Sequence, residues 1–375
     1  MLHGFLILLI VGLSVSAVTP GARVSTTSGT LNGFTNGTVK TFLGVPYGLP
    51  PVGDLRWRHA VPVNVSGTEV NATKFGPGCG QLVVAGIPWS GALSPSDESE
   101  DCLSLNIWAP RDGNHLPILV FAPGGGYQIG TSSSASYDGH HIAKTGRAIF
   151  VSLNYRLNIF GFPSTTPIPS EIDQNVGITD SRLAVEWVAK NIAQFGGDPS
   201  RIIIAGQSAG AHLFNTHVYA YEKNPIAAGQ ILASGAIGLV STAPADGVFW
   251  NNISDILGCG NTTNVSQVSR TAWFKYPHIL FPFIQVACMR NASFDDVKST
   301  ALKINAYFNP SADGSIIFTN DTYLARAANG SFAHIPALLT STNNEGSLFV
   351  EPYSSVYPNG TTADVASDAI VCPGG

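Results

Sequence analysis

Ser208 lies in a pattern that favours nucleophilic chemistry. It stands at the centre of Gly206-x-Ser208-x-Gly210, directly after the isoleucine run 202–204 and before an alanine-containing stretch. This order predicts a strand, a sharp turn and a helix, which is the context of a nucleophile elbow. The small flanking residues let strand and helix approach each other, and free N–H groups at the helix start favour developing negative charge. We therefore interpret Ser208 as a candidate nucleophile.

Glu345 is the candidate acid of a triad whose members follow in the order Ser, acid, His. The apolar run 335–339 predicts a buried strand, and Glu345 lies in the polar turn after it. A carboxylate there can orient a histidine, whereas the alternative is a solvated loop carboxylate. All nine histidines precede Glu345. His212 lies one helical turn after Ser208, and we expect its side chain to point along the helix rather than over the hydroxyl.

The glycine triplet 124–126 follows the apolar run 117–122, which predicts another strand. Consecutive glycines let backbone N–H groups turn inward and bind the oxygen of a tetrahedral intermediate. Taken alone, the triplet is an ordinary turn after a strand. Together with Ser208 it indicates an oxyanion loop.

The elements that must position these residues alternate along the chain. Strand-like runs occur at 117–122, 148–153, 201–205 and 335–339, and the stretch 180–195 has apolar residues at roughly helical spacing. Trp187 in that stretch is expected in the core. No linker, repeat or low-complexity tract divides residues 18–375, so we expect one α/β domain with a mostly parallel sheet.

Composition and the N-terminus indicate a secreted protein. Charged residues make up 11% of the chain and the net charge is −5, which gives no basic footprint for nucleic acid. The apolar run 5–15 precedes small residues around Ala17, so residues 1–17 are predicted to be a cleaved signal peptide. No other stretch has the length of a transmembrane helix.

Glycosylation sequons and cysteines point to the same compartment. The five cysteines suit an oxidising environment, and one of them is left over after pairing. Asn-x-Ser/Thr sequons predict a glycoprotein. They begin at Asn36, Asn64, Asn71, Asn252, Asn261, Asn264, Asn291, Asn320, Asn329 and Asn359.

Seven motifs, in a fixed order, resemble the type-B carboxylesterase/lipase family, the cholinesterase-like α/β hydrolases, and most of all its secreted fungal members. They are FLGVPYG (42–48), SEDCLSLNIWAP (99–110), PGGGY (123–127), NYRL (154–157), RLAVEW (182–187), GQSAG (206–210) and CMRN (288–291). The chain departs from the usual family residues at Ser104, Pro123, Gln207 and Asn344. None of these departures removes a catalytic group.

The resemblance implies an α/β-hydrolase fold and a carboxylic ester hydrolase that forms a serine acyl-enzyme intermediate. It implies no cofactor and no metal, and a small-molecule or lipid ester as the substrate. The residue roles that it implies are Ser208 and Glu345 as catalytic residues, Gly125, Gly126 and Ala209 as oxyanion donors, and disulfides Cys79–Cys102 and Cys259–Cys288. The short, mixed Cys79–Cys102 loop favours soluble or short-chain esters.

Family members continue well beyond the length of this chain and carry the catalytic histidine, and in some of them the partner of Cys372, in that part. We therefore expect the chain to be C-terminally incomplete and, as written, without appreciable esterase activity. The alternatives are a non-catalytic cholinesterase-like adhesion or recognition domain, or an inactive fragment. Ser208 and Glu345 favour the enzyme.

The segment 268–285 is aromatic and apolar, without a clean period, and lies in a loop that is shorter in the family. Val268-Ser269 and Gln285 can be encoded as splice donor and acceptor sites. We expect 268–285 to be a retained intron, with a genuine apolar insertion, such as a pocket flap, as the alternative. A cDNA across this region distinguishes the two.

Overall fold

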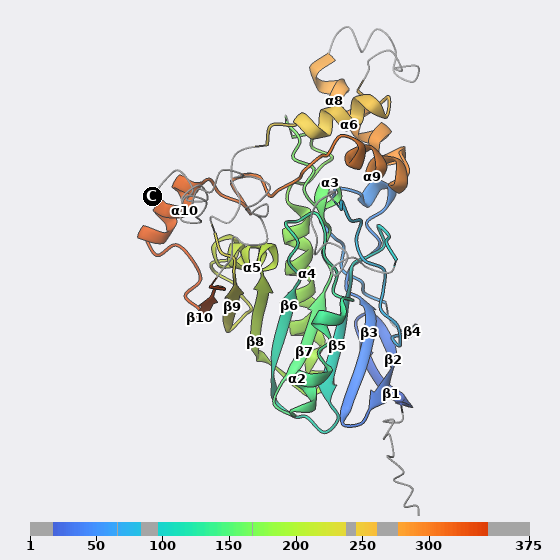
Figure 1. Cartoon of the computed structure of the whole chain (residues 1–375), viewed down its shortest axis with the longest axis vertical. Helices are drawn as coiled ribbons and strands as arrows, with labels where there is room; N and C mark the ends of the chain where they lie inside the picture. Colours follow the sequence, from blue (N-terminus) through green and yellow to red (C-terminus); the bar gives the residue numbers. More distant parts are fainter. Residues whose placement is uncertain are drawn as a thin grey trace, which may run out of the picture.

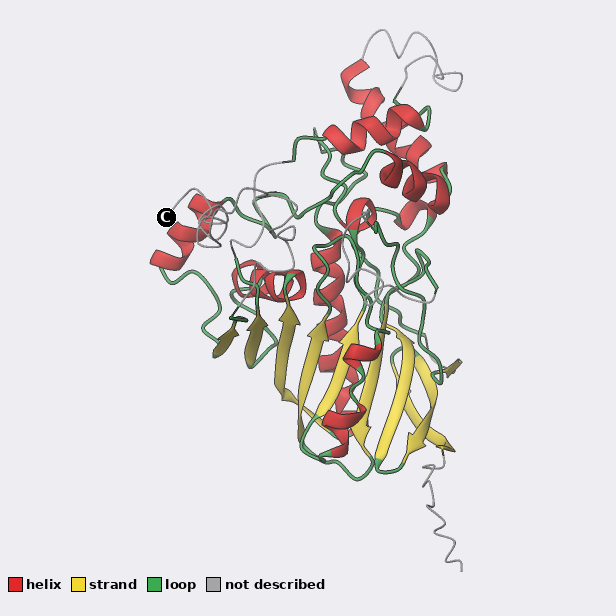
Figure 2. Ribbon diagram, viewed as in Figure 1, coloured by secondary structure: helices red, strands yellow, loops and turns green. Residues whose placement is uncertain are grey.

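A ten-stranded mixed sheet forms the centre of the molecule (Figure 2). The computed structural model describes residues 18–65, 67–83, 97–166, 168–237, 245–260 and 277–343. The strands are β1 (Val18–Thr26), β2 (Gly29–Asn36), β3 (Val39–Pro46), β4 (Glu69–Asn71), β5 (Ser104–Pro110), β6 (Leu116–Ala122), β7 (Ile149–Leu153), β8 (Gly197–Gln207), β9 (Gly229–Ala233) and β10 (Ala337–Thr340).

The sheet has an antiparallel half and a parallel half. Its order is β1-β2-β3-β5-β7-β6-β8-β9-β10, and β4 pairs with β2. Strands from β1 to β7 pair antiparallel along this order, whereas β7, β6, β8, β9 and β10 pair parallel. The carboxyl ends of the parallel strands therefore meet at one edge, where α/β proteins place their ligand sites.

Helices cover both faces of the sheet. The α-helices are α2 (His140–Lys144), α3 (Asn158–Gly161), α4 (Val176–Asn191), α5 (Ala209–Ala220), α6 (Val248–Ile256), α8 (Pro277–Asn291), α9 (Phe294–Lys303) and α10 (Asn320–Ala328). The shorter 3₁₀ turns are Gly53–Leu55, Ala135–Tyr137 and Ile192–Phe195. Figure 1 shows α4 behind the sheet, α2 in front of it, and α6, α8 and α9 beyond the carboxyl ends of the parallel strands.

Alternating side chains divide the core between the two faces. Ile149 and Val151 of β7 belong to the large apolar cluster that also contains α4 and α5 residues, whereas Phe150 between them packs with Trp108 and Ala143 on the α2 side. This is the period of two that a strand imposes on its side chains. Strands buried on both faces explain why these segments are almost wholly apolar in sequence.

The α/β-hydrolase prediction is confirmed, with differences in detail. Trp187 is buried in the core, and its Nε1–H donates to Ser28 Oγ at 2.8 Å. The predicted helix 180–195 begins earlier, at Val176, and continues after Asn191 as a 3₁₀ turn. The antiparallel half of the sheet was not predicted from the sequence.

The strand expected at 335–339 is present as β10 (Ala337–Thr340), but its side chains are exposed. Leu338 is 56% exposed and Leu339 62% exposed. The reason is that β10 lies at the end of the sheet order, and within the described residues β9 is its one partner strand. Apolar sequence alone does not distinguish a central strand from an edge strand.

Four predicted features fall partly or wholly outside the described residues. The signal peptide 1–17, Glu345 and Cys372 lie outside them. Of the segment 268–285, residues 277–285 form the first part of α8, and the Gln285 amide donates to Ser254 Oγ at 2.9 Å. The retained intron stays a prediction.

Both expected disulfides are present. Cys79 and Cys102 are bonded with their Cα atoms 5.0 Å apart, and Cys259 and Cys288 with theirs 5.5 Å apart. These separations lie within the usual range for disulfides. The Cys259–Cys288 bond ties the end of α6 to α8, and the Cys79–Cys102 bond ties the start of a loop to the residues preceding β5.

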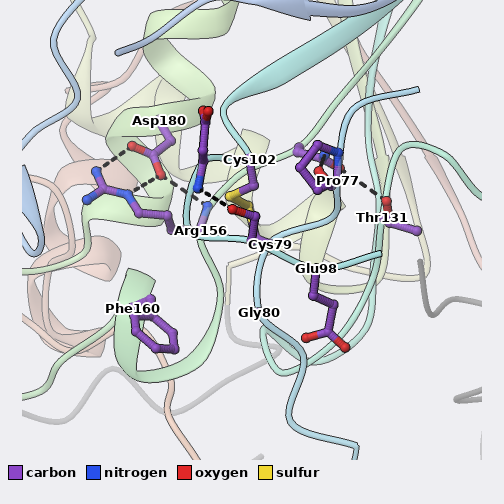
Figure 3. Close-up of a disulfide and its surroundings, with 12 residues drawn as sticks. Pro77, Cys79, Gly80, Glu98, Cys102, Thr131, Arg156, Phe160 and Asp180 are labelled. Atoms are coloured by element: carbon purple, nitrogen blue, oxygen red, sulfur yellow. Dashed lines mark hydrogen bonds and ion pairs between the residues drawn. A yellow bond between two sulfur atoms is a disulfide. The ribbon is translucent and has the colours of Figure 1, made fainter. Parts of the chain in front are cut away.

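A buried ion pair lies next to the Cys79–Cys102 disulfide (Figure 3). Asp180 in α4 accepts hydrogen bonds from Arg156 Nε at 2.8 Å and from Arg156 Nη2 at 2.7 Å. It also accepts from the Arg156 backbone N–H at 3.0 Å, and both side chains are buried. The pair therefore fixes the segment after β7 against the helix that covers the sheet.

We expect Asp180→Asn to lower the free energy of unfolding by about 3–5 kcal/mol, because it leaves the Arg156 charge buried without its counter-ion. Urea unfolding measures this. Asp112→Asn is the matched control, since the Arg111–Asp112 pair is exposed and exposed pairs contribute about 1 kcal/mol or less. Equal losses in the two variants would contradict the prediction.

Candidate active site

Ser208 occupies the turn between β8 and α5 with an unusual backbone conformation. Its φ is 55° and its ψ is −123°. A positive φ in a residue other than glycine costs on the order of 1–3 kcal/mol and persists only where neighbours hold it. Here the Ser208 N–H donates to Ala233 O at 2.8 Å, and Ser208 O accepts from the His212 N–H at 3.0 Å. These bonds fix the backbone, while Ser208 remains partly exposed.

Close backbone contacts explain the glycines on both sides of Ser208. A Cβ added to Gly206 would lie 2.3 Å from the Gly210 carbonyl carbon, and one added to Gly210 would lie 2.2 Å from Ala122 O. A Cβ on Gly235 would lie 2.3 Å from Ser208 O. Distances under about 3 Å leave no room for a side chain, so the turn requires these glycines.

The glycine triplet after β6 lies beside Ser208. A Cβ added to Gly124 would be 3.1 Å from the Ser208 Cβ and 2.6 Å from Gln207 O. Gly125 and Gly126 have φ values of 125° and 61°, which is the region that glycine tolerates. The structure thus brings together two segments that are far apart in sequence, because β6 and β8 are neighbours in the sheet.

The carbonyl groups of this loop are used within the protein. The hydrogen bonds are Tyr155 Oη to Pro123 O (2.9 Å), Gln128 N and Ile129 N to Gly125 O (3.0 and 3.1 Å), Gln128 Nε2 to Gly126 O (2.9 Å) and Asn158 N to Tyr127 O (2.7 Å). Within the described residues, the N–H groups of Gly125 and Gly126 donate to no acceptor. The loop therefore offers donors rather than acceptors.

A third donor comes from α5. Ala209 is the first residue of this helix, so its N–H has no intrahelical acceptor. The positive end of the helix dipole adds to the field at this point. The oxyanion-donor role expected of Gly125, Gly126 and Ala209 stays a prediction.

Within the described residues, no other member of a triad is hydrogen-bonded to Ser208. Glu345 lies outside the described residues. Among the histidines whose side chains the structure describes, none has a ring nitrogen hydrogen-bonded to Ser208. His212 Nδ1 forms its hydrogen bond with Tyr127 Oη, at 2.5 Å, and His334 Nε2 bonds to Gly330 O at 3.2 Å.

Several side-chain contacts around the site were not predicted from the sequence. Tyr127 and His212 form a buried hydrogen bond, the Gln128 amide binds both backbone groups of Phe308, and Tyr307 Oη donates to Gly126 O at 3.3 Å. Tyr127 directly follows the triplet, and His212 lies one turn after Ser208. These positions in the sequence suggested that both residues lie near the site. Only the folded chain shows that their side chains are in contact.

Two buried histidines of α5 have strongly lowered pKa values. Burial lowers the pKa of His212 from 6.5 to about 4. The pKa of His217 falls to about 3, first through burial and then through the positive charge of Arg182. His217 Nε2 lies 2.9 Å from Ser181 Oγ. Both rings are therefore neutral in the folded protein at neutral pH.

Known proteins resemble this chain along most of its length. A model described as the Carboxylesterase family matches residues 20–368. A chlorogenic acid esterase of Aspergillus niger is 36% identical over 341 residues, which are 86% of this chain and 62% of the relative. An acetylcholinesterase of Bungarus fasciatus is 31% identical, over 90% of this chain and 56% of its own.

Lipase 2 of Diutina rugosa is 32% identical over 92% of this chain and 65% of its own. The chain thus spans more than half but less than two thirds of the length of these three relatives. In the part of the chain that the structure describes, the helices are too short or too polar to cross a membrane.

We expect the free energy of unfolding to fall as the pH is lowered from about 6.5 towards about 4. Over this window the unfolded chain protonates His212 and His217, whereas the folded chain holds both rings neutral. Above the pKa of the histidines in the unfolded chain, their contribution to the free energy of unfolding is fully present. Below that pKa, each histidine contributes a slope of about 1.4 kcal/mol per pH unit. Urea unfolding at a series of pH values measures the slope. An identical slope in His217→Phe would refute the assignment.

Proposed function

The chain belongs to the carboxylesterase family, and we propose that it is a carboxylic ester hydrolase that works through a serine acyl-enzyme intermediate. The observation that carries this proposal is the backbone of Ser208, held at a φ of 55° at the start of α5 beside the glycine loop. A nucleophile elbow has this conformation because it lifts the hydroxyl clear of the sheet.

In this mechanism Ser208 Oγ attacks the ester carbonyl carbon while its proton passes to a histidine. The carbonyl oxygen becomes an oxyanion, for which the proposed donors are the N–H groups of Gly125, Gly126 and Ala209. The tetrahedral intermediate collapses with loss of the alcohol, which takes up the proton from the histidine. Water then repeats the sequence on the acyl-enzyme and releases the acid.

Glu345 is proposed to orient the histidine, as its position after β10 suggests. The base itself is proposed to lie outside these 375 residues, which is supported by the histidines whose side chains the structure describes, since none hydrogen-bonds to Ser208. An unactivated hydroxyl is a weak nucleophile near neutral pH. On this proposal the 375-residue chain alone has no appreciable esterase activity, whereas the full-length product of the gene has.

The proposed substrate is a small, soluble ester. A chlorogenic acid esterase and a lipase among the relatives support ester substrates in general. The short Cys79–Cys102 separation of 23 residues favours soluble or short-chain esters over emulsified lipid.

We also propose that the protein is secreted and N-glycosylated. Both disulfides suit an oxidising compartment. Each sequon asparagine within the described residues is exposed or partly exposed, as attachment of a glycan requires. These are Asn36, Asn64, Asn71, Asn252, Asn291, Asn320 and Asn329.

We expect the full-length product of the gene to hydrolyse p-nitrophenyl esters, and Ser208→Ala to lower kcat by about 10⁴–10⁶-fold, as when a triad loses a member. Steady-state kinetics and labelling by a fluorophosphonate measure the change. Ser299→Ala, at an exposed position on α9, is the control and should retain activity and labelling. Unchanged turnover in Ser208→Ala would overturn the assignment.

We expect treatment of the secreted protein with a glycosidase that removes N-linked glycans to lower its mass. Asn71→Gln should remove one glycan, because Asn71 is exposed and its Oδ1 accepts from the Thr73 hydroxyl of the same sequon at 2.7 Å. Asn224→Gln, an exposed asparagine outside any sequon, is the control. Intact-mass spectrometry distinguishes the outcomes, and an unglycosylated secreted protein would contradict the prediction.

A further inference from the structure

His212 is a buried polar side chain with no part in the chemistry proposed above. Its Nδ1 lies 2.5 Å from Tyr127 Oη, whereas its Nε2 is buried without a partner within the described residues. A buried nitrogen without a hydrogen bond costs free energy, and an apolar side chain could fill the space without that cost. The role of His212 therefore depends on the segments that its one side-chain hydrogen bond connects.

That bond connects the two segments that flank the serine. His212 lies on α5, and its backbone N–H donates to Ser208 O at 3.0 Å. Tyr127 directly follows Gly126 and has a positive φ of 62°. One side-chain hydrogen bond thus joins the helical turn after Ser208 to the loop that carries the Gly125 and Gly126 amides.

Packing restricts the Tyr127 ring sideways, and the hydrogen bond restricts it along its own axis. The ring is fully buried, with edge-to-face contacts to Phe162 at 4.8 Å and to Tyr155 at 6.4 Å between centroids. The main-chain oxygen of Tyr127 accepts a hydrogen bond from the Asn158 N–H at 2.7 Å. Oη is the atom of Tyr127 farthest from its backbone. A hydrogen bond at this atom therefore fixes the distance between the Tyr127 backbone and α5, and with it the position of the glycine loop.

The bond persists over the neutral pH range. Burial lowers the pKa of His212 to about 4 and raises the pKa of Tyr127 well above its ordinary value. Neither group carries a charge at neutral pH, so no change of protonation breaks the contact there. The pair is a fixed connection rather than a switch.

We infer that His212 is a positioning residue, which through Tyr127 sets the distance between the oxyanion loop and Ser208. This inference rests on the proposed function, because the distance matters for catalysis only if an oxyanion forms at the loop. We therefore expect loss of the hydrogen bond to weaken stabilisation of the transition state more than it weakens substrate binding.

Four single variants of the full-length product of the gene, and the His212→Leu/Tyr127→Phe double variant, test this inference. His212→Leu removes the bond at similar volume, and Tyr127→Phe removes only Oη. His212→Asn keeps a hydrogen-bonding atom near the Nδ1 position and is the conservative rescue. His217→Leu is the matched control, because it removes a buried histidine bond on the same helix, to Ser181 Oγ, away from the loop.

We expect His212→Leu and Tyr127→Phe each to lower kcat for a p-nitrophenyl ester by about 10- to 100-fold, a smaller loss than removal of an oxyanion donor itself. KM should change little, the double variant should be no worse than either single one, and His212→Asn should recover part of kcat. His217→Leu should lower the melting temperature but keep kcat within about threefold of the parent.

Hydrogen exchange of the peptide containing residues 124–128 provides a readout that does not depend on turnover. Its amides should exchange faster in His212→Leu and Tyr127→Phe than in His217→Leu. Equal exchange and equal kcat in the three variants would overturn the inference. If the parent enzyme hydrolyses no ester, the proposed function fails, yet the exchange comparison still decides whether His212 holds the loop. Tyr127→Phe retains the whole ring and serves if His212→Leu does not fold.

Discussion

The backbone of Ser208 is held at a positive φ, and much of the surrounding structure serves that constraint. The Ser208 N–H donates to Ala233 O at the end of β9, and the carbonyl accepts from the first turn of α5. The glycines at 206, 210 and 235 remove the side chains that would collide there. Strain in one residue is thus supported by two strands and a helix, as is usual at functional sites.

The sheet brings the remaining parts of the site to the same edge. Because β6 and β8 are parallel neighbours, the glycine loop after β6 and the turn after β8 lie side by side. The loop carbonyls are satisfied by Tyr155, Gln128 and Asn158. This arrangement leaves amides available and explains how a glycine-rich segment, flexible in isolation, acquires one conformation here.

Features that depend on short segments of the chain were predicted from the sequence, whereas contacts between distant segments were not. The strands around 117–122, 148–153 and 201–205, the elbow and the disulfides followed from local pattern or family resemblance. The exposure of Leu338 and Leu339 follows from the place of β10 at the end of the sheet order, which a local apolar pattern does not reveal. The Tyr127–His212 bond was not predictable either, since it joins side chains 85 positions apart. Buried polar pairs of this kind are specified only by the fold.

The strand order also has a consequence for how the chain folds as it is synthesised. Strands β1 to β3 pair with their sequence neighbours, and their other partners, β4 and β5, follow by Pro110. Strand β8 instead lies between β6 and β9, and Ser208 is bonded to Ala233. The elbow therefore cannot close until residue 233 has emerged. We therefore expect the N-terminal strands β1 to β3 to pair before the turn that holds Ser208 is formed.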